Sequence, residues 1–318
     1  MYIMKRKVLL FAVFLLFLTL FSVSVSAELN TTQINKGYSC LQNKTANCST
    51  SLDDNIFTLL SAKTCKSQVM LASSNDECWP TGACKIKQTA QALFALKESG
   101  ARASTVKPKA WLLAHTKAAT NLEWYLQIDA EEITTCTITY SVGSAERSYQ
   151  ISIGTDKKIN DGAGSCLSLS ETGYWLKIAP QCQSNEYKIS CDKDFVTNSL
   201  FKEQSSPTIH VGAKINSASS GGTTTEKINS SCFADGQGCS YEGTLWASLV
   251  LDSLNEDISS YIPYLVTAAD NNPKSFPEAF LYILSGESYR NDLLLKQKNS
   301  QYWETSGDRY YDTALALF

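Results

Sequence analysis

Histidine is scarce in this chain. Its 318 residues include two, His115 and His210, and these lie far apart in the sequence. The eleven cysteines contain no Cys-x2-Cys pair, the spacing on which many zinc sites are built. Lysine and arginine form no long run, and the formal net charge is −3, so the chain offers no broad positive field for nucleic acid. We therefore expect neither a zinc site nor a nucleic-acid partner.

Catalytic motifs are also missing. The segment Gly162-Ala163-Gly164-Ser165-Cys166 lacks the third glycine of a dinucleotide loop, and it is not the Gly-x-Ser-x-Gly of a hydrolase. Neither histidine has a recognisable acid and nucleophile as partners. Asp129, Glu131 and Glu132 could form a general acid and base pair for sugar cleavage, but a polar interdomain loop explains them more simply. We expect no catalytic residue, no metal and no cofactor.

Residues 1–27 have the three parts of a secretory signal peptide. Basic Lys5-Arg6-Lys7 precede an apolar run over residues 8–21, and Val25-Ser26-Ala27 are small enough for a signal peptidase. The apolar residues up to position 25 could also span a membrane, so an uncleaved anchor is the alternative. In both cases we expect the remainder to lie outside the cytoplasm, secreted or at the cell surface.

The cysteines fit this location, because thiols at such density are usually oxidised in exported proteins. Short sequence separations favour four disulfide bonds, each closing a turn. Cys65, Cys136 and Cys166 are left without an assigned partner, and the odd total leaves at least one cysteine unpaired. The four candidate pairs are Cys40 with Cys48, Cys78 with Cys84, Cys182 with Cys191, and Cys232 with Cys239.

Four Asn-x-Ser/Thr tripeptides are candidate sites of N-linked glycosylation. They begin at Asn30, Asn43, Asn47 and Asn229, and none has proline in the middle. Three of them precede residue 50, which favours an exposed segment at the start of the mature chain. We expect all four to lie in surface loops.

Hydrophobic periodicity divides the chain into helical and strand-forming parts. Apolar residues at helical spacing predict helices near residues 53–60, 85–99 and 108–115. From residue 133 the period changes to two, which predicts five or six short strands with polar turns between them. Residues 217–225 contain no large apolar side chain and are interpreted as part of a flexible linker.

Helical spacing returns after the linker. It predicts helices near residues 245–254, 258–266 and 277–284, a short one at 293–295, and a last one near 313–318. Ser275-Phe276-Pro277-Glu278 resembles a capping box. The last helix reaches Phe318 without a residue that ends helices, so we expect the natural protein to continue.

Two distant segments of the sequence match each other. Trp79 precedes Thr89-Ala90-Gln91-Ala92-Leu93-Phe94 by ten residues, and Trp303 precedes Thr313-Ala314-Leu315-Ala316-Leu317-Phe318 by the same number. With Lys109-Ala110-Trp111-Leu112-Leu113, they resemble the repeats of the α/α-toroid superfamily. That superfamily includes terpenoid cyclases, protein prenyltransferase β subunits, α2-macroglobulin-type thioester domains and cobalamin carriers.

The resemblance implies an α+β multidomain chain, in which a partial α/α toroid of helical hairpins contains an inserted, small, disulfide-bearing antiparallel β sandwich or barrel. The expected divisions are the signal peptide (1–27), the first toroid part (28–130), the β domain (131–216), the linker (217–228) and the second toroid part (229–318). The relatives' catalytic motifs are absent. Gly238-Cys239-Ser240-Tyr241-Glu242 lacks residues of the thioester motif, and Asp308 and Asp312 lack the neighbours of an Asp-rich cyclase motif.

We therefore expect an exported cell-envelope or secreted binding and recognition protein on a toroid scaffold, with an unknown ligand or envelope partner. Membrane attachment would come only from an uncleaved signal or a missing C-terminal anchor. One alternative is a polysaccharide- or terpenoid-active enzyme with its active site at the toroid mouth or beyond residue 318. The other is a carrier of a small hydrophobic or cofactor-like ligand, since the fold alone does not select a function.

Overall fold

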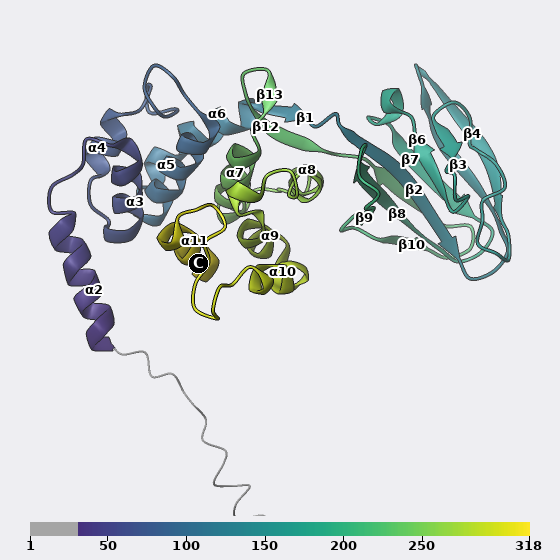
Figure 1. Cartoon of the computed structure of the whole chain (residues 1–318). Helices are drawn as coiled ribbons and strands as arrows, with labels where there is room; N and C mark the ends of the chain where they lie inside the picture. The colour runs from purple at the N-terminus through teal and green to yellow at the C-terminus, as the bar shows by residue number, and fades with distance from the viewer. Residues whose placement is uncertain (1–30) are drawn as a thin grey trace, which may run out of the picture. The chain divides into compact units, whose positions relative to one another are not determined.

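The computed structural model describes residues 31–318, so the predicted signal peptide and the Asn30 tripeptide lie outside the described residues. The chain divides into two compact units, Met1–Asn47 and Cys48–Phe318. Within the first unit, the described residues form helix α2 (Thr31–Lys44), none of whose residues is buried, and a short segment after it. The remaining elements belong to the second unit (Figure 1).

The second unit begins with short helices around their own small core. Ser51 starts the first of them, because its side chain accepts a hydrogen bond from the backbone N–H of Asp54. Ile56, Leu59 and Val69 pack there against Trp79, and all four are almost completely buried. Residues of α3 (Leu52–Ala62) and α4 (Lys66–Leu71) belong to this core. The helices η1 (Arg102–Thr105) and α6 (Val106–Ala114) follow later in the chain, and Leu112 of α6 packs in a separate, larger core.

Helices α5 (Ile86–Glu98) and α7 (Tyr241–Ser253) form the centre of the largest hydrophobic core. They approach closely at Gly243, where a Cβ atom would lie 3.0 Å from the Cβ of Ile86 and 2.6 Å from the Oγ of Ser240. Glycine therefore permits this contact. The same Ser240 Oγ accepts a hydrogen bond from Gly243 N at 3.2 Å and caps α7.

The C-terminal helices complete this core. α9 packs against α7, and each of α8, α10 and α11 contacts α9 (Figure 1). Pro277 occupies the first position of α9, where its missing N–H costs no helical hydrogen bond. The elements are α8 (Ile262–Thr267), η3 (Pro273–Ser275), α9 (Pro277–Ser285), η4 (Gly286–Tyr289), α10 (Arg290–Leu295) and α11 (Arg309–Leu317).

Within residues 31–318, strands form three antiparallel sheets. A small sheet has the order β1-β12-β13, and a four-stranded sheet has the order β11-β7-β3-β4. In the third sheet the order is β10-β8-β2-β6-β5, and β9 also pairs with β8. The strand bounds are β1 (Thr116–Ala118), β2 (Leu122–Ala130), β3 (Thr134–Val142), β4 (Ala145–Ile153), β5 (Leu167–Leu169), β6 (Trp175–Ile178), β7 (Glu186–Cys191), β8 (Phe195–Glu203), β9 (His210–Val211), β10 (Asn216–Ala218), β11 (Thr223–Lys227), β12 (Ser231–Asp235) and β13 (Gly238–Cys239).

The two larger sheets share one hydrophobic core, separate from those of the helices. Ile138 of β3 and Ile189 of β7 come from one sheet, and Leu126 of β2 and Leu176 of β6 come from the other. Between β6 and β7, η2 (Pro180–Cys182) contributes Cys182 to the same core. The mixed α+β class expected from the sequence is confirmed.

Two strands, β2 and β11, lie in segments where the sequence predicted no strand. β2 lies in the expected first helical part, 28–130, yet it pairs with both β6 and β8. Six of its nine positions, including consecutive Trp124, Tyr125 and Leu126, are buried, which hides the alternation by which strands are detected. The expected linker, 217–228, contains β11, whose Thr224 and Glu226 are buried. That segment is part of a sheet.

The structure contains five disulfide bonds, and they differ in part from the pairs proposed on sequence separation. Cys182 and Cys191 are not joined to each other, because antiparallel pairing of β3 with β7 places Cys136 directly opposite Cys191. Cys48 bonds to Cys65, so the proposed pair with Cys40 is also absent, and Cys40 is free and exposed. The bonds are Cys48–Cys65, Cys78–Cys84, Cys136–Cys191, Cys166–Cys182 and Cys232–Cys239.

The two matching tryptophan segments make the same local hydrogen bonds. The Trp79 backbone N–H donates to Thr89 Oγ1 at 3.0 Å, and the equivalent distance from Trp303 to Thr313 is 3.1 Å. Each indole N–H donates to a backbone carbonyl ten residues earlier, that of Val69 or that of Leu293, at 2.6 and 2.8 Å. The similarity in sequence therefore reflects a shared junction between a loop and a helix.

The toroid prediction is wrong. The described residues form helices of 6 to 14 residues combined with antiparallel sheets, without a detectable repeat or toroid. The physical reason is that the matching segments specify only a local junction. They do not determine how many hairpins follow or how these pack around a ring, and strands occupy much of the chain between them.

Candidate functional site

The three carboxylates singled out in the sequence do lie together, at one end of the two-sheet core. Asp129, Glu131 and Glu132 line a hollow of about 1010 Å³ with Asp192, Asp194 and two lysines. Several of these groups already have partners. The nearest Nζ–Oε2 distance between Lys193 and Glu132 is 2.9 Å, and Asp194 accepts a hydrogen bond from the backbone N–H of residue 220.

Asp192 in the same hollow has a structural role. Its Oδ1 accepts hydrogen bonds from Thr134 Oγ1 at 2.6 Å and from the backbone N–H of Thr135 at 2.9 Å. These two bonds hold the pKa of Asp192 below its usual value, since they favour the charged form. The hollow is therefore lined by strand ends and loops that its own charged groups hold in place, which favours a structural role over ligand binding.

His115 ends helix α6 and is exposed. Its ring stacks on Trp111, with 3.8 Å between ring centroids, and its Nδ1 lies 2.7 Å from the Trp111 carbonyl oxygen. These contacts stay within one helix, and no described acid forms a hydrogen bond with the ring. The position favours a packing role over catalysis.

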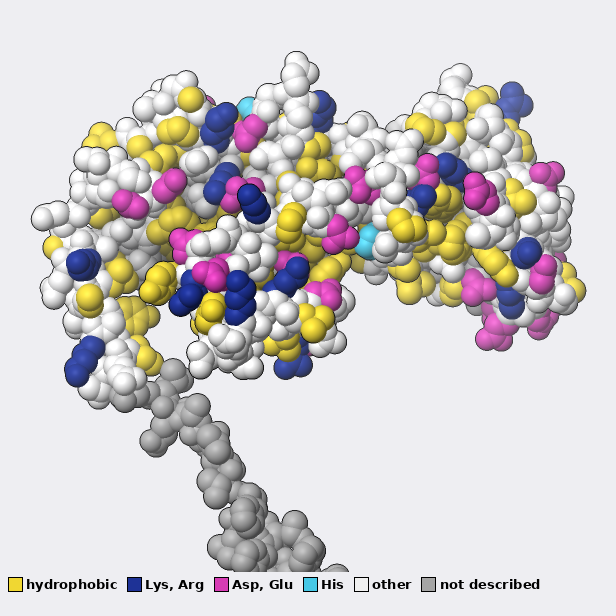
Figure 2. Space-filling view, in the orientation of Figure 1, with side chains coloured by type: hydrophobic (Ala, Val, Ile, Leu, Met, Phe, Trp, Pro, Cys, Tyr) yellow, Lys and Arg dark blue, Asp and Glu magenta, His cyan; other side chains and the backbone are white. Residues whose placement is uncertain are grey.

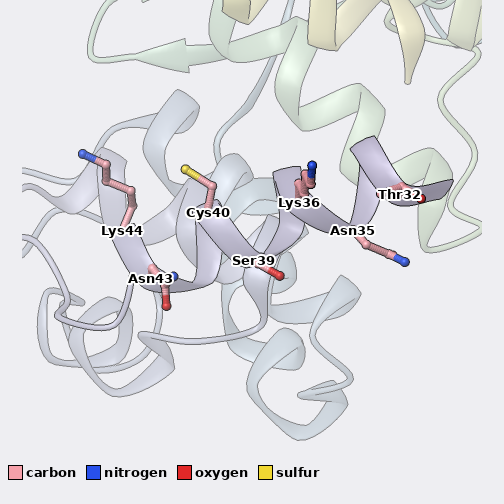
Figure 3. A pocket seen from close by; sticks show the side chains of 7 residues that line it. All are labelled: Thr32, Asn35, Lys36, Ser39, Cys40, Asn43 and Lys44. Carbon is pink, nitrogen blue, oxygen red and sulfur yellow. The ribbon is translucent and has the colours of Figure 1, made fainter. Parts of the chain in front are cut away.

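A surface depression on α2 is also a poor candidate. Figure 3 shows that its lining side chains all come from this one helix. It includes Cys40 and Asn43, both exposed. The seven residues are Thr32, Asn35, Lys36, Ser39, Cys40, Asn43 and Lys44.

The best candidate site is a cleft of about 560 Å³ in the second unit, which we call the His210 cleft. Three separate segments line it: the end of β8 with the following loop and β9, the end of α8 with the following loop, and α9 to α10. Serine, threonine and a few apolar side chains make up much of the wall. Its charged and titratable members are Glu203, His210, Asp270, Glu278, Tyr289, Asp292 and Lys296.

His210 is held in this cleft by the pairing of β9 with β8. Its ring stacks on that of Phe201, its partner in the register, at a centroid distance of 5.5 Å. Gly212 follows β9 and lies very close to β8. A Cβ atom added to Gly212 would be 2.7 Å from Ser199 Oγ, so a larger residue would not fit without a shift. Burial lowers the pKa of His210 below its ordinary value of 6.5, and the negative charge of Asp270 opposes this shift.

Glu278 lies in the first turn of α9, on the other side of the cleft. Its Oε1 is 3.2 Å from Lys296 Nζ. Its Oε2 is buried, and no donor reaches that oxygen from any residue that the structure describes. The capping box expected from Ser275 and Glu278 is not formed, because the Glu278 carboxylate pairs with Lys296 instead.

Of the remaining acids of the cleft, Asp270 and Asp292 are exposed and Glu203 is partly buried. Glu203 accepts hydrogen bonds from the Asn271 side chain at 3.1 and 3.0 Å, one to each oxygen. Asp270 and Asp292 make no hydrogen bond or ion pair with another described side chain. Burial raises the pKa of Tyr289, and the negative charge of Asp292 raises it further.

Carboxylates outnumber cations in the cleft. Of the described residues lining it, Lys296 is the one lysine or arginine, against four acids, and burial lowers the pKa of His210, which favours its neutral form. This excess is local: Figure 2 shows acidic and basic side chains interspersed over the visible face of the molecule. The cleft is thus suited to a ligand that carries positive charge or hydrogen-bond donors.

The described residues contain neither a cluster of metal ligands nor a membrane-spanning helix. No group of three or more histidine, cysteine, aspartate or glutamate side chains within residues 31–318 is arranged to hold a metal ion. None of the helices in that range is both long and apolar enough to cross a membrane.

No family model, curated protein or solved structure matches the chain. Sequence reasoning singled out His210 but not its partners in the cleft. Glu278 was noticed only as a capping residue, and no sequence signal connects it to His210, which is 68 positions away on a different element.

Proposed function

We propose that this chain acts outside the cytoplasm as a recognition protein, secreted or at the cell surface, and that its ligand occupies the His210 cleft. The five disulfide bonds support an extracellular or otherwise oxidising environment. In this proposal the sheets of residues 122–227 lie, in sequence order, between two helical parts near residues 48–115 and 241–318. His210 comes from the sheets and Glu278 from the helices.

The observation that carries the proposal is the buried Glu278 Oε2 without a donor. A carboxylate oxygen removed from water without a hydrogen bond costs about 1–3 kcal/mol or more, so such atoms are rare in folded proteins. Lys296 satisfies the other oxygen, Oε1. A ligand that places a donor beside Lys296 would give Oε2 its missing partner once the carboxylate turns toward the cleft.

The surrounding charges favour a cationic donor. Asp270 and Asp292 stand exposed in the same lining and form no ion pair with a residue that the structure describes, so an ammonium group would gain attraction from both. Hydrogen bonds between charged partners contribute about 1.5–3 kcal/mol each. We therefore assign the cleft to a ligand with an alkyl ammonium group, such as a lysine side chain of an envelope or secreted partner.

Titration calorimetry with N-acetyl-L-lysine methylamide tests this assignment, with uncharged N-acetyl-L-norleucine methylamide as the matched probe. We expect the amine to bind and the norleucine compound to bind at least tenfold more weakly. Glu278→Gln should weaken amine binding by about 10- to 100-fold, the equivalent of losing one charged hydrogen bond.

Glu287→Gln is the control variant, since Glu287 is an exposed acid near the cleft but outside its lining. It should leave the affinity unchanged. Equal affinity for the two probes, or equal effects of the two substitutions, would contradict the proposal.

A second candidate is a polysaccharide-active enzyme that uses the same cleft. The observation that favours it is the presence of Asp270, Glu278 and Asp292 with the ring of Tyr289 in one concave lining, since glycoside hydrolysis uses paired carboxylates. Release of reducing sugar from a panel of cell-wall polysaccharides, abolished by Glu278→Gln and retained by Glu287→Gln, would select this function over recognition.

A further inference from the structure

We infer that Asn229 is an acceptor of N-linked glycan in the folded protein. Among the described Asn-x-Ser/Thr tripeptides, it begins the one in which neither the asparagine amide nor the hydroxyl of the third residue is held in a hydrogen bond. The inference depends on the chain reaching an extracytoplasmic compartment. It does not depend on what the His210 cleft binds.

Asn229 lies between β11 and β12, in a stretch where side chains alternate between core and solvent. Ile228 is 8% exposed and belongs to the core of the two sheets. Ser230 turns inward again, with its Oγ buried. Asn229, between them, is exposed and makes no hydrogen bond with its side chain inside the described range. Its amide nitrogen therefore faces solvent.

The third residue of the tripeptide is also available. The backbone of Ser231 is fixed, because its N–H donates to the Ser260 carbonyl at 2.7 Å and β12 pairs there with β1. Its hydroxyl forms no hydrogen bond within the described part of the chain, and the residue is partly exposed. A transferase that recognises this hydroxyl would not have to break a native contact.

The other two described tripeptides differ in this respect. Asn43 and Asn47 are exposed, but the Thr45 hydroxyl donates to the Leu41 carbonyl at 2.9 Å. The Ser49 hydroxyl donates to the Asp54 carboxylate at 2.8 Å. In addition, the residue between Asn47 and Ser49 is a disulfide-bonded cysteine. In the folded chain the hydroxyl groups of Thr45 and Ser49 are therefore engaged in hydrogen bonds, whereas that of Ser231 makes none with the described residues.

The donor would be an oligosaccharide linked to a polyprenyl diphosphate. In the transfer, a bond forms between Asn229 Nδ2 and the anomeric carbon of the first sugar, and the bond from that carbon to the diphosphate oxygen breaks. The diphosphate leaves with the electron pair, and one amide proton is released to solvent. No oxidant or reductant is required.

The test is transfer by a purified single-subunit oligosaccharyltransferase to the full chain with its disulfide bonds intact, followed by peptide mass mapping. We expect glycan on Asn229 of the folded chain, and at least tenfold less on Asn43 and Asn47. Ser231→Ala should abolish modification of Asn229, whereas Ser231→Thr should retain it. The reduced, denatured chain serves as the control for enzyme activity and should be modified at all three positions.

An unmodified Asn229 in the folded chain would overturn the inference, whether or not the denatured chain reacts. So would modification that persists in Ser231→Ala. Because this readout is independent of ligand binding, its failure would leave the cleft proposal unaffected.

Discussion

Replacing Thr89 by valine tests the hydrogen bonds that fix the first tryptophan segment. Valine has nearly the same shape as threonine and is similarly branched at Cβ, so packing and helix propensity change little. What is lost is the hydroxyl, which accepts from the Trp79 N–H at 3.0 Å and donates to the Trp79 carbonyl at 3.3 Å.

The expected cost follows from burial. Trp79 and Thr89 are both 0% exposed, so the Trp79 N–H would be left without an acceptor and without water. We expect Thr89→Val to lower the free energy of unfolding by about 1–3 kcal/mol, the penalty of one unsatisfied buried donor.

The second segment provides a matched comparison inside the same molecule. Thr313 makes the same bonds to Trp303, at 3.1 and 3.3 Å, but it is only partly buried. Water can replace the lost hydroxyl there, so Thr313→Val should cost about 0.5–1 kcal/mol, within the net range of an ordinary hydrogen bond.

Urea unfolding followed by tryptophan fluorescence, with the disulfide bonds intact, measures both changes. The prediction is an ordering, with the Thr89 variant less stable than the Thr313 variant. A Thr89→Val protein as stable as the wild type, or a larger loss at Thr313, would show that burial of this junction is not what makes its hydrogen bonds important.

The remaining predictions concern packing, a disulfide bond and protonation. Gly243→Ala should destabilise the protein by about 1–3 kcal/mol in urea unfolding, because the added methyl group meets Ile86 and the serine that caps α7; a stabilised variant would contradict this close approach. Replacing Cys136 and Cys191 together by alanine should cost about 2–4 kcal/mol, measured in the same way, because the bond closes a loop of 55 residues. His210 should titrate below 6.5 by NMR. Since the unfolded chain then binds this proton more readily, stability should fall as the pH drops through 6.5 toward the lowered pKa, and His210→Gln should reduce the fall.

Periodicity located the elements that have one buried and one exposed face. Strands β3 and β7 show such alternation and lie within a few residues of the predicted ranges. Helices α5 and α9 were also located by their apolar spacing, although Thr89 to Leu96 of α5 are all buried. β2 was missed because it is buried at most positions. β11 was missed because its inward-facing residues, Thr224 and Glu226, are polar and are satisfied by bonds to Thr197 and Asn216.

The site was less accessible to sequence reasoning than the fold. Asp129, Glu131 and Glu132 are neighbours in the chain, so their proximity follows from the sequence, but the contacts made by Asp192 and Lys193 in the same hollow do not. The His210 cleft joins segments that are dozens of residues apart. Its assembly depends on tertiary packing, for which a single sequence gives no signal. The tryptophan segments show the converse, since a strong local signal led to the wrong family.

The most direct test of the cleft proposal uses the two histidines as reporters. Imidazole NMR signals of the wild-type chain are followed while N-acetyl-L-lysine methylamide is added at constant pH. We predict that the His210 signals move and saturate, while those of His115, which stacks on Trp111 outside the cleft, stay in place. Unchanged His210 signals, or equal movement of both histidines, would contradict a specific ammonium site in the cleft.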